Sequence, residues 1–254
     1  MKKLFIITLC LLLAGCIKPL PAFNPDLSGK TVGWGFRRTD NGPEFTEGQK
    51  STMEKYKCIY KEDTKEKNIY LTFDEGYENG YTPLILDTLR EKGVRAAFFV
   101  TAPYVKENPD LIKRMAKEGH IIGNHTVNHP SLPSITNELK FEKELFELDR
   151  LVHSICRKNT VFLRPPKGEY SEKTLSKSLD MGYTNVFWSD TYVDWNNDVS
   201  CEKAKETVIK NLHPGEVLLL HAVSKGNADA LADIIDTARK NGYTFKSLEE
   251  YPLN

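Results

Sequence analysis

The sequence has no excess of charge of either sign. Its 254 residues include 35 lysines and arginines and 35 aspartates and glutamates, which gives a formal net charge of zero. Proteins that bind a nucleic-acid backbone use clustered cations to neutralise its phosphates, and this composition offers no basic surplus for that purpose. We therefore expect no nucleic-acid partner.

Cysteine is scarce as well. Three of the five cysteines lie beyond residue 16, namely Cys58, Cys156 and Cys201, and no CxxC pair is present. An odd number of cysteines without paired spacing does not indicate a disulfide framework. We expect three small buried thiols, because free cysteine behaves as a small apolar side chain.

No apolar run is long enough to cross a membrane. The segment Leu4–Ala14 has eleven residues, whereas a transmembrane helix needs roughly 20. It follows two lysines and precedes small residues before Cys16, which is the pattern of a secretory signal. "LAGC" also resembles the lipobox of bacterial lipoproteins, which predicts removal of residues 1–15, a lipid on Cys16 and an exported protein anchored to the outer face of the cytoplasmic membrane. An ordinary signal peptide with an unmodified Cys16 is the alternative.

The region that follows is rich in proline, glycine and polar residues up to about residue 50. We interpret residues 16–66 as a tether and an arm, with Trp34 and Phe36 packing on the main domain and a helix at Met53–Tyr60. The main domain is expected at residues 67–251.

From Ile69 onward, short apolar runs alternate with amphipathic segments. The predicted strands are Ile69–Phe73, Ala96–Thr101, Ile121–Asn124, Val161–Arg164, Asn185–Ser189, Val217–Leu220 and Thr244–Lys246. The predicted helices are Pro83–Lys92, Leu111–Lys117, Glu138–Cys156, Ser171–Met181, Glu202–Leu212 and Ala228–Lys240. This alternation indicates an α/β fold whose parallel strands close into, or nearly into, a barrel. An open doubly wound sheet is the alternative.

Polar residues follow five of these strands. They are Asp74 and Glu75, His125 and His129, Arg164, Asp194 with Trp195, and His221. In a parallel barrel the loops after the strands converge at one rim, so these side chains are expected to meet. His120, His153 and His213 fall outside the pattern, and we expect them at the surface or at helix ends.

The spacing of His125 and His129 predicts two imidazoles on the same side of one helical turn. Together with a carboxylate from another strand, such a pair commonly holds a divalent metal. Two exposed histidines would have the same spacing. The other residues also have plain alternatives: a turn cap at Asp74, a structural ion pair at Arg164 and a core histidine at position 221.

Five short motifs identify a family. "TFDEG", "HTVNH", "RPPKG", "DW" and "LLLH" occur in this order between Lys67 and Tyr251 and resemble the motifs of the polysaccharide deacetylases, the NodB-homology family 4 of carbohydrate esterases. "TFDEGYENGYT", "RPPKGEYSE" and "LLLHAVSKGNADAL" are most similar to the delta-lactam-biosynthetic de-N-acetylases, which act on muramic acid in spore-cortex peptidoglycan. The resemblance implies a distorted (β/α)7-8 barrel of the NodB-homology type with an N-terminal arm.

The resemblance also implies catalytic roles for four residues. Asp74 would be the general base that activates water, and Arg164 would pair with it and keep its pKa low. His221 would protonate the leaving amine, with Asp194 orienting its ring. Amide hydrolysis needs a general base for the water and a general acid for the leaving amine, and a carboxylate on one side of the amide and an imidazole on the other can supply them.

A divalent metal, with zinc as the expected ion, is implied at His125 and His129. The sequence departs from the family at Glu75, where most members have the aspartate that serves as third ligand. Glutamate can ligate a metal, but its extra methylene displaces the oxygens. Glu75 is therefore expected either to ligate the metal or to lie just behind it.

Three further residues are implied to contact substrate. Trp195 and Leu219 would line the slot for the acetyl methyl group, and the backbone N–H of Lys167 would help to stabilise the oxyanion. The Lys167 side chain is also a candidate partner for an anionic substrate group such as the lactyl carboxylate of muramic acid.

These expectations converge on an exported hydrolase that removes N-acetyl groups from muramic acid in peptidoglycan strands, a step toward muramic delta-lactam in spore cortex. We expect a monomer that contacts the membrane only through its anchor. Deacetylation of N-acetylglucosamine in peptidoglycan or another glycan is one alternative, and a non-catalytic glycan-binding lipoprotein is another. A complete set of proton-transfer residues argues against the binder.

Overall fold

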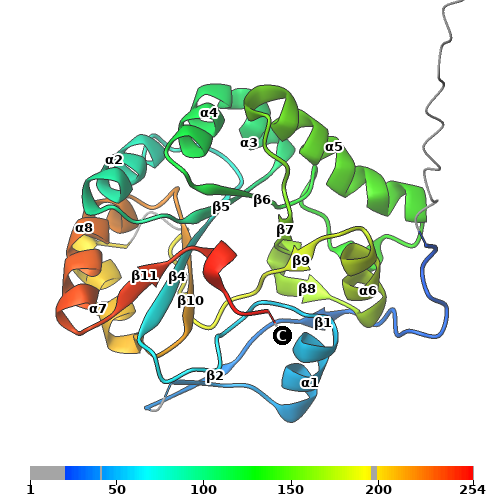
Figure 1. The fold of residues 1–254 in the computed structure, drawn as a ribbon, viewed down its shortest axis with the longest axis horizontal. Coiled ribbons are helices and arrows are strands. Elements are labelled where there is room, and N and C mark those ends of the chain that lie inside the picture. Colours follow the sequence, from blue (N-terminus) through cyan, green and yellow to red (C-terminus); the bar gives the residue numbers. More distant parts are fainter. Residues whose placement is uncertain (1–20, 41, 196–198, 254) are drawn as a thin grey trace, which may run out of the picture.

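The computed structural model describes residues 21–40, 42–195 and 199–253 (Figure 1). The expected signal segment and the expected lipidation site, Cys16, lie outside these residues. None of the helices in the described ranges combines the length and the apolar character that a membrane span requires.

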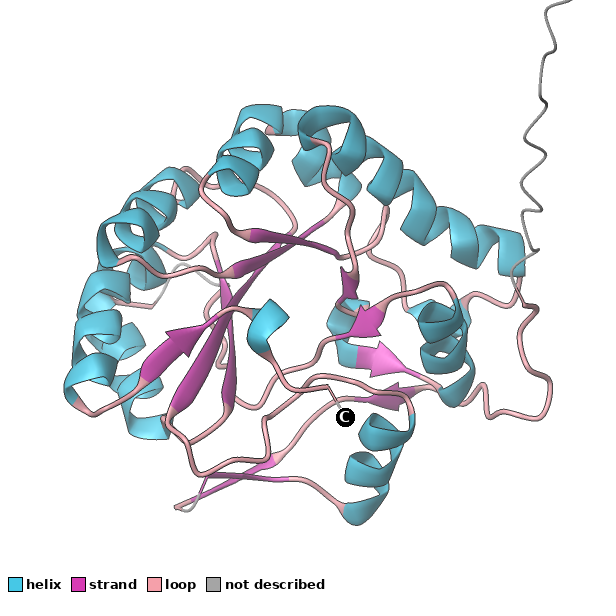
Figure 2. Ribbon diagram, viewed as in Figure 1, coloured by secondary structure: helices cyan, strands magenta, loops and turns pink. Residues whose placement is uncertain are grey.

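Seven parallel strands form one curled sheet with helices on its outer side (Figures 1 and 2). The strands are β4 (Asn68–Glu75), β5 (Ala97–Val100), β6 (Ile121–Asn124), β7 (Phe162–Leu163), β9 (Thr184–Asn185), β10 (Glu216–His221) and β11 (Thr244–Lys246). Their order is β10-β4-β5-β6-β7-β9. β11 pairs with the start of β4 and β5 with its later part, so β4 is the central strand of the sheet.

The two edges of the curled sheet are joined by the segment after β9. The N–H of Ser189 donates to the carbonyl of Val217 at 2.9 Å, and the N–H of Leu219 donates to the carbonyl of Asp190 at 2.9 Å. The sheet is therefore nearly closed, which confirms the barrel prediction over the open sheet. Of the predicted strand Asn185–Ser189, only Asn185 lies in a regular strand.

Alternation along β4 separates two apolar layers. Ile69, Leu71 and Phe73 face the helices and belong to the largest core cluster, whereas Tyr70 lies inside the barrel with Phe99. Successive residues of a strand point to opposite faces. The same alternation places Thr72 and Asp74 on the interior side, where the candidate site lies.

Most of the helices lie on the outside of the sheet, whereas α1 packs with the N-terminal arm (Figure 1). The helices are α1 (Glu47–Lys55), α2 (Thr82–Lys92), α3 (Ala102–Glu107), α4 (Pro109–Lys117), α5 (Glu138–Cys156), α6 (Glu172–Asp180), α7 (Cys201–Asn211) and α8 (Lys225–Lys240), with short 3-10 turns η1 (Leu132–Ser134), η2 (Pro166–Gly168) and η3 (Leu248–Glu250). α5 agrees with the prediction at both ends, and α3 was not predicted. Helix α1 begins six residues before the predicted segment, because Thr46 and Gln49 form a capping box at its start.

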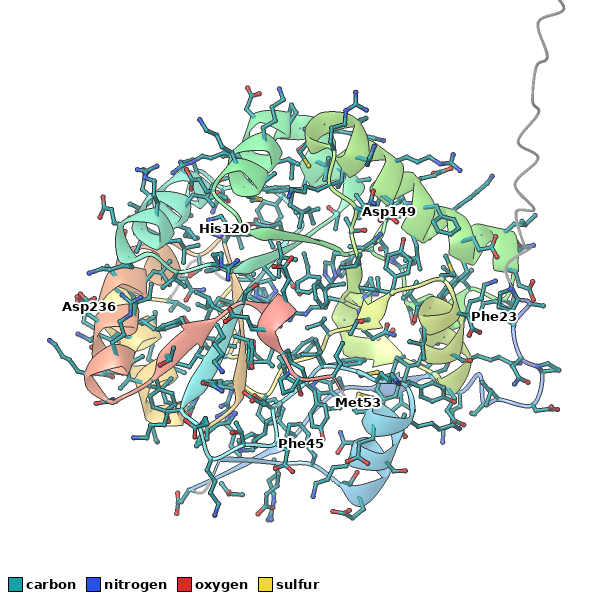
Figure 3. All side chains as sticks on the ribbon, in the orientation of Figure 1. Phe23, Phe45, Met53, His120, Asp149 and Asp236 are labelled. Atoms are coloured by element: carbon teal, nitrogen blue, oxygen red, sulfur yellow. The ribbon has the colours of Figure 1, made fainter. Side chains whose placement is uncertain are left out.

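The arm packs on the barrel as expected. β1 (Val32–Gly33) pairs with β8 (Glu169–Tyr170), and β2 (Arg37–Thr39) pairs with β3 (Gly42–Glu44). The Trp34 ring lies 4.9 Å from that of Phe187 and 5.2 Å from that of Phe45, and its Nε1 donates to the carbonyl of Trp188 at 2.8 Å. Phe36 contributes less, since it is only half-buried and lies 5.7 Å from Phe45. Phe45 and the buried Met53 lie in this region of the molecule (Figure 3).

From Pro21 onward the N-terminal segment contacts helices α5 and α6 of the main domain. The buried Lys177 donates to the carbonyl of Pro21 at 2.6 Å and to Oε1 of Glu142 at 2.6 Å. The N–H of Phe23 donates to Glu138 at 2.8 Å, and its ring packs edge-on against Phe141. Little of the predicted tether is therefore free among the described residues.

The cysteines at 58, 156 and 201 are all free thiols, in agreement with the absence of a disulfide framework. Cys58 is buried as expected. Cys156 and Cys201 are only partly buried, because they lie at the end of α5 and the start of α7.

Candidate active site

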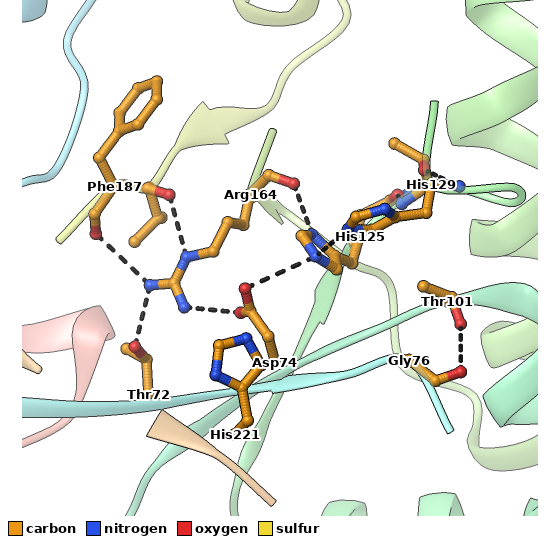
Figure 4. A network of polar contacts seen from close by, with 12 residues as sticks. Thr72, Asp74, Gly76, Thr101, His125, His129, Arg164, Phe187 and His221 are labelled. Carbon is orange, nitrogen blue, oxygen red and sulfur yellow. Dashed lines mark hydrogen bonds and ion pairs between the residues drawn. The ribbon is translucent and has the colours of Figure 1, made fainter. Parts of the chain in front are cut away.

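The ends of β4 and β10 bring Asp74 and His221 together. In the parallel pairing of the two strands these residues are register partners. Both side chains lie on the interior faces of their strands and point into the barrel. In Figure 4 the Asp74 carboxylate lies between the Arg164 guanidinium and the His125 ring, with the His221 ring next to it.

Arg164 holds Asp74 from behind. The guanidinium is fully buried, and it donates to Oδ1 of Asp74 at 2.7 Å and to Oγ1 of Thr72 at 2.9 Å. It also stacks over the ring of Phe99 at 4.2 Å. Burial alone would raise the pKa of Asp74, but the charge of Arg164 and its hydrogen bond contribute most to a net shift downward. Asp74 is therefore ionised at neutral pH.

His125 and His129 meet on a loop, not on a helical turn as predicted. Residues 125–130 have no regular secondary structure, and Thr126 and His129 have φ values of 70° and 55°. The Nε2 atoms of the two rings are nevertheless 3.1 Å apart. Nε2 of His125 also lies 3.5 Å from Oδ2 of Asp74. The four-residue spacing correctly predicted that the two rings lie close together, but a loop and not a helical turn brings them there.

The two imidazoles are neutral. Burial lowers the pKa of His125, and burial together with the neighbouring His125 lowers the pKa of His129 to about 4. Nδ1 of His125 lies 2.8 Å from the carbonyl oxygen of Arg164. A carbonyl only accepts hydrogen bonds, so Nδ1 carries the hydrogen and Nε2 presents a lone pair.

Glu75 does not join the two histidines. β4 continues through Glu75, which pairs with Val100, so its side chain lies on the helix-facing side of the strand, opposite to Asp74. It is fully buried, and neither carboxylate oxygen has a hydrogen-bond partner of standard geometry among the described residues. Burial, and then the charges of Glu78 and Asp74, raises the pKa of Glu75 well above its usual value. The predicted ligand set is corrected accordingly: the strand's alternation turns Glu75 away from the site.

His221 is oriented by Asp194. Nδ1 of His221 lies 2.7 Å from Oδ1 of Asp194, and the backbone N–H of His221 donates to Oδ2 at 2.8 Å. Burial lowers the pKa of His221, but the hydrogen bond and the charge of Asp194 outweigh burial, and the net shift is upward. The ring is thus held with Nε2 free and is readily protonated.

The three predicted substrate contacts come from three different segments near the site. The Trp195 ring is 54% exposed and packs edge-on against the His221 ring, with centroids 5.2 Å apart. Leu219 is buried two residues before His221 on the same face of β10. Lys167 is exposed and has a φ of 61° in the turn after Arg164. All three belong to the segments that form the site.

Two supporting residues were not predicted. Thr72 accepts from Arg164 and donates to the carbonyl of Leu218 at 2.7 Å; its place two residues before Asp74 on an inward face could have indicated it. Asn227 donates to Asp194 and, at 3.2 Å, to the carbonyl of His221, and no pattern in the sequence pointed to it. His120 and His213 are buried, contrary to expectation. His153 is exposed near the end of α5 as expected.

Comparison with known proteins places this geometry in a family. The family described as polysaccharide deacetylase matches residues 61–186. The peptidoglycan-N-acetylmuramic acid deacetylase PdaA of Bacillus subtilis is 47% identical over 224 residues, which cover 86% of this chain and 85% of PdaA. The chain belongs to the polysaccharide deacetylase family.

Solved structures agree with this assignment. The structure of Bacillus subtilis PdaA, described as a family 4 carbohydrate esterase, matches this deacetylase with a TM-score of 0.86 and 44% identity, covering 89% of this chain and 98% of PdaA. In the comparison of sequences, a peptidoglycan-N-acetylglucosamine deacetylase of Bacillus cereus is 34% identical over 202 residues, which cover 78% of this chain and 73% of the relative. The predicted family and its curled α/β fold are therefore confirmed.

The residues of this deacetylase fit a divalent metal in part. Two neutral imidazoles present Nε2 atoms 3.1 Å apart, close to the separation of two ligands around one tetrahedral zinc ion. The ionised Asp74 lies beside them. The described residues include no group of three His, Cys, Asp or Glu side chains in metal-site geometry, because Glu75 points to the other side of β4.

Proposed function

We propose that this deacetylase removes N-acetyl groups from muramic acid residues of peptidoglycan. The reaction is supported by one observation above others. Asp74 and His221 lie side by side as register partners of β4 and β10, and their pKa values are shifted in opposite directions. The choice of muramic acid is supported by the greater identity to the muramic acid deacetylase, 47%, than to the glucosamine deacetylase, 34%.

The proposed mechanism divides proton transfer between these two residues. Asp74, ionised beside Arg164, accepts a proton from the water that attacks the acetamide carbonyl. His221 carries a proton on Nε2 while Nδ1 is held by Asp194, and it donates that proton to the departing amine. Trp195 and Leu219 exclude water from the position of the acetyl methyl group.

His125 and His129 are proposed to hold a divalent ion, with zinc as the first candidate. An ion bound there would supply Lewis acidity, which lowers the pKa of a water and polarises the amide carbonyl. The neutral state of both rings and the fixed tautomer of His125 favour this role, since only deprotonated imidazole nitrogen binds a metal.

Lys167 is proposed to recognise the lactyl carboxylate that distinguishes muramic acid from glucosamine. It is exposed in the turn that follows Arg164, and its charge suits an anionic group on the sugar. Replacement by alanine should reduce kcat/KM more for muramic than for glucosamine substrates. Equal losses for the two sugars would reject this assignment.

Acetate release from defined glycans tests the function as a whole. The protein is offered matched oligomers whose only acetylated sugar is either muramic acid or glucosamine, with and without a chelator. Release from the muramic substrate alone supports the proposal, and release from the glucosamine substrate alone supports the alternative specificity. Binding of either glycan without acetate release would indicate a non-catalytic glycan-binding protein.

We further propose that the protein is an exported lipoprotein attached through Cys16 and that it acts during synthesis of spore-cortex delta-lactam. The lipobox-like "LAGC" supports the first part, and the similarity to the muramic acid deacetylase supports the second. A Cys16→Ser protein that stays in the membrane fraction would contradict the anchor. Muropeptide analysis of cortex from a deletion strain tests the second part, because delta-lactam should be lost.

A further inference from the structure

The loop between the two candidate metal ligands is held in an unfavourable backbone conformation. Thr126 has a φ of 70° and His129 a φ of 55°. Positive φ is uncommon outside glycine, and for a β-branched residue such as threonine it is a steric outlier. Such a conformation persists only where the surrounding structure enforces it. Several hydrogen bonds enforce it here, and most of them lead to helix α5.

The loop is fixed at its beginning by Asn124. Its Oδ1 accepts from the N–H of Thr126 at 2.8 Å, and its Nδ2 donates to the carbonyl of Leu145 on α5 at 3.0 Å. Within the loop, Oγ1 of Thr126 accepts from the N–H of His129 at 3.0 Å. These contacts hold the His125 end of the loop on the helix.

The other end is fixed by Glu144. Its Oε2 accepts from the backbone N–H of Asn128 at 2.9 Å, and its Oε1 accepts from Nδ2 of Asn128 at 2.7 Å. Its backbone carbonyl accepts from the N–H of Val127 at 3.0 Å. Asn128 immediately precedes His129, so the position of the second imidazole depends on this bidentate contact.

Glu144 has no other evident purpose. It is 6% exposed in the interior of the 19-residue helix α5. Glu142, two residues earlier, pairs with Lys177, whereas no cation forms an ion pair with Glu144 among the residues that the structure describes. A buried carboxylate is costly unless its oxygens are satisfied, and among the described residues Asn128 satisfies both, Oε2 through its backbone N–H and Oε1 through its side-chain amide.

We propose that Glu144 is a positioning residue for the metal site. Its carboxylate accepts one hydrogen bond from the backbone N–H of Asn128 and one from the side-chain amide. These two contacts fix the loop that holds Nε2 of His129 at 3.1 Å from Nε2 of His125. The inference rests on the proposed role of the two histidines as ligands. A site on a loop gains precision when a rigid helix supports it from behind.

The test is Zn²⁺ affinity of the purified protein, measured by competition with a chelating dye. Glu144→Met removes both acceptors at similar side-chain volume, and Asn128→Asp places a carboxylate against a carboxylate. Each single variant should weaken Zn²⁺ binding about 10- to 100-fold, the usual cost of losing an outer-shell partner. Glu147→Met, on the exposed face of the same helix, is the matched control and should bind as wild type does.

The double variant Glu144→Gln with Asn128→Asp separates positioning from general destabilisation. In this variant the introduced amide still accepts from the backbone N–H and donates to the introduced carboxylate, so both contacts return with one polarity reversed. Zn²⁺ affinity should recover to within about threefold of wild type. Glu144→Met with unchanged affinity, or a double variant no better than Asn128→Asp alone, overturns the proposal.

Two further measurements keep the outcome interpretable. If Glu144→Met fails to fold, Asn128→Ala, at an exposed position, removes the side-chain contact and should still weaken binding. A wild-type protein that binds no Zn²⁺ would reject the metal site itself. Amide exchange at Asn128 then tests the contact with Glu144 alone: Glu144→Met should accelerate it by about tenfold or more, and an unchanged rate overturns the inference.

Discussion

Asp74 and His221 are register partners at the ends of two adjacent parallel strands, and their pKa values are shifted in opposite directions. The base and the acid of the proposed reaction are therefore placed by the same pair of strands. Neither residue depends on a flexible loop for its position.

Replacing His221 by alanine should lower kcat by roughly 10²- to 10⁴-fold, the usual contribution of a general acid. KM should change little, because the ring contributes a proton and little binding surface. Acetate release under saturating glycan measures this. His153→Ala, an exposed histidine on α5, is the control, and an active His221→Ala protein would remove this residue from the mechanism.

Replacing Asp194 by asparagine should move the alkaline limb of the pH profile to lower pH. Asp194 raises the pKa of His221, and His221 must be protonated to act as the acid. Activity is therefore lost as the pH rises through the pKa of His221, and without the Asp194 charge that loss begins at lower pH. Profiles of kcat/KM against pH show the shift, with Asp180→Asn as an exposed control. Superimposable profiles would contradict the orienting role.

Replacing Arg164 by methionine should reduce the free energy of unfolding by about 3–5 kcal/mol, because it leaves Asp74 buried without its cation. The double variant with Asp74→Asn should lose less than the sum of the two single losses, since the unpaired charge is then gone. Urea unfolding measures both. Arg150→Met, on the exposed side of α5, is the control, and strict additivity would argue against the pair.

Replacing Glu75 by glutamine should leave Zn²⁺ affinity unchanged, because Glu75 faces away from the histidines. It should also change the pH dependence of stability. The folded-state pKa of Glu75 is raised, so wild-type stability falls as the pH rises above the unfolded value of about 4.3. The amide does not titrate, and the variant should gain stability relative to wild type as the pH rises from the unfolded-state pKa of Glu75 toward its raised folded-state pKa. Glu91→Gln is the exposed control; a weaker Zn²⁺ affinity in the Glu75 variant would restore the ligand role.

The sequence predicted which side chains lie together at the strand ends, because each strand end has a strong local signal. An apolar run that stops at a charged residue marks Asp74, Arg164 and His221 without any knowledge of distant contacts. Strand–helix alternation likewise predicted the curled parallel sheet. Both signals are local, and the family motifs coincide with them.

The differences have separate causes. Glu75 was expected as a ligand because it stands where most family members have the third-ligand aspartate, but β4 continues through Glu75 and strand alternation sends it to the face opposite Asp74. The loop of His125 and His129 depends on Glu144, which is fixed by tertiary packing of α5. Asn227 reaches Asp194 from α8, across a distance that the sequence does not reveal.

If Cys16 carries the proposed lipid, the hydrogen bond from Lys177 to Pro21 limits how far the domain can lie from the membrane. The five peptide steps from Cys16 to Pro21 can span at most about 18 Å, even when fully extended. An enzyme anchored in this way would operate directly above the bilayer surface and would meet only the innermost glycan strands of the wall.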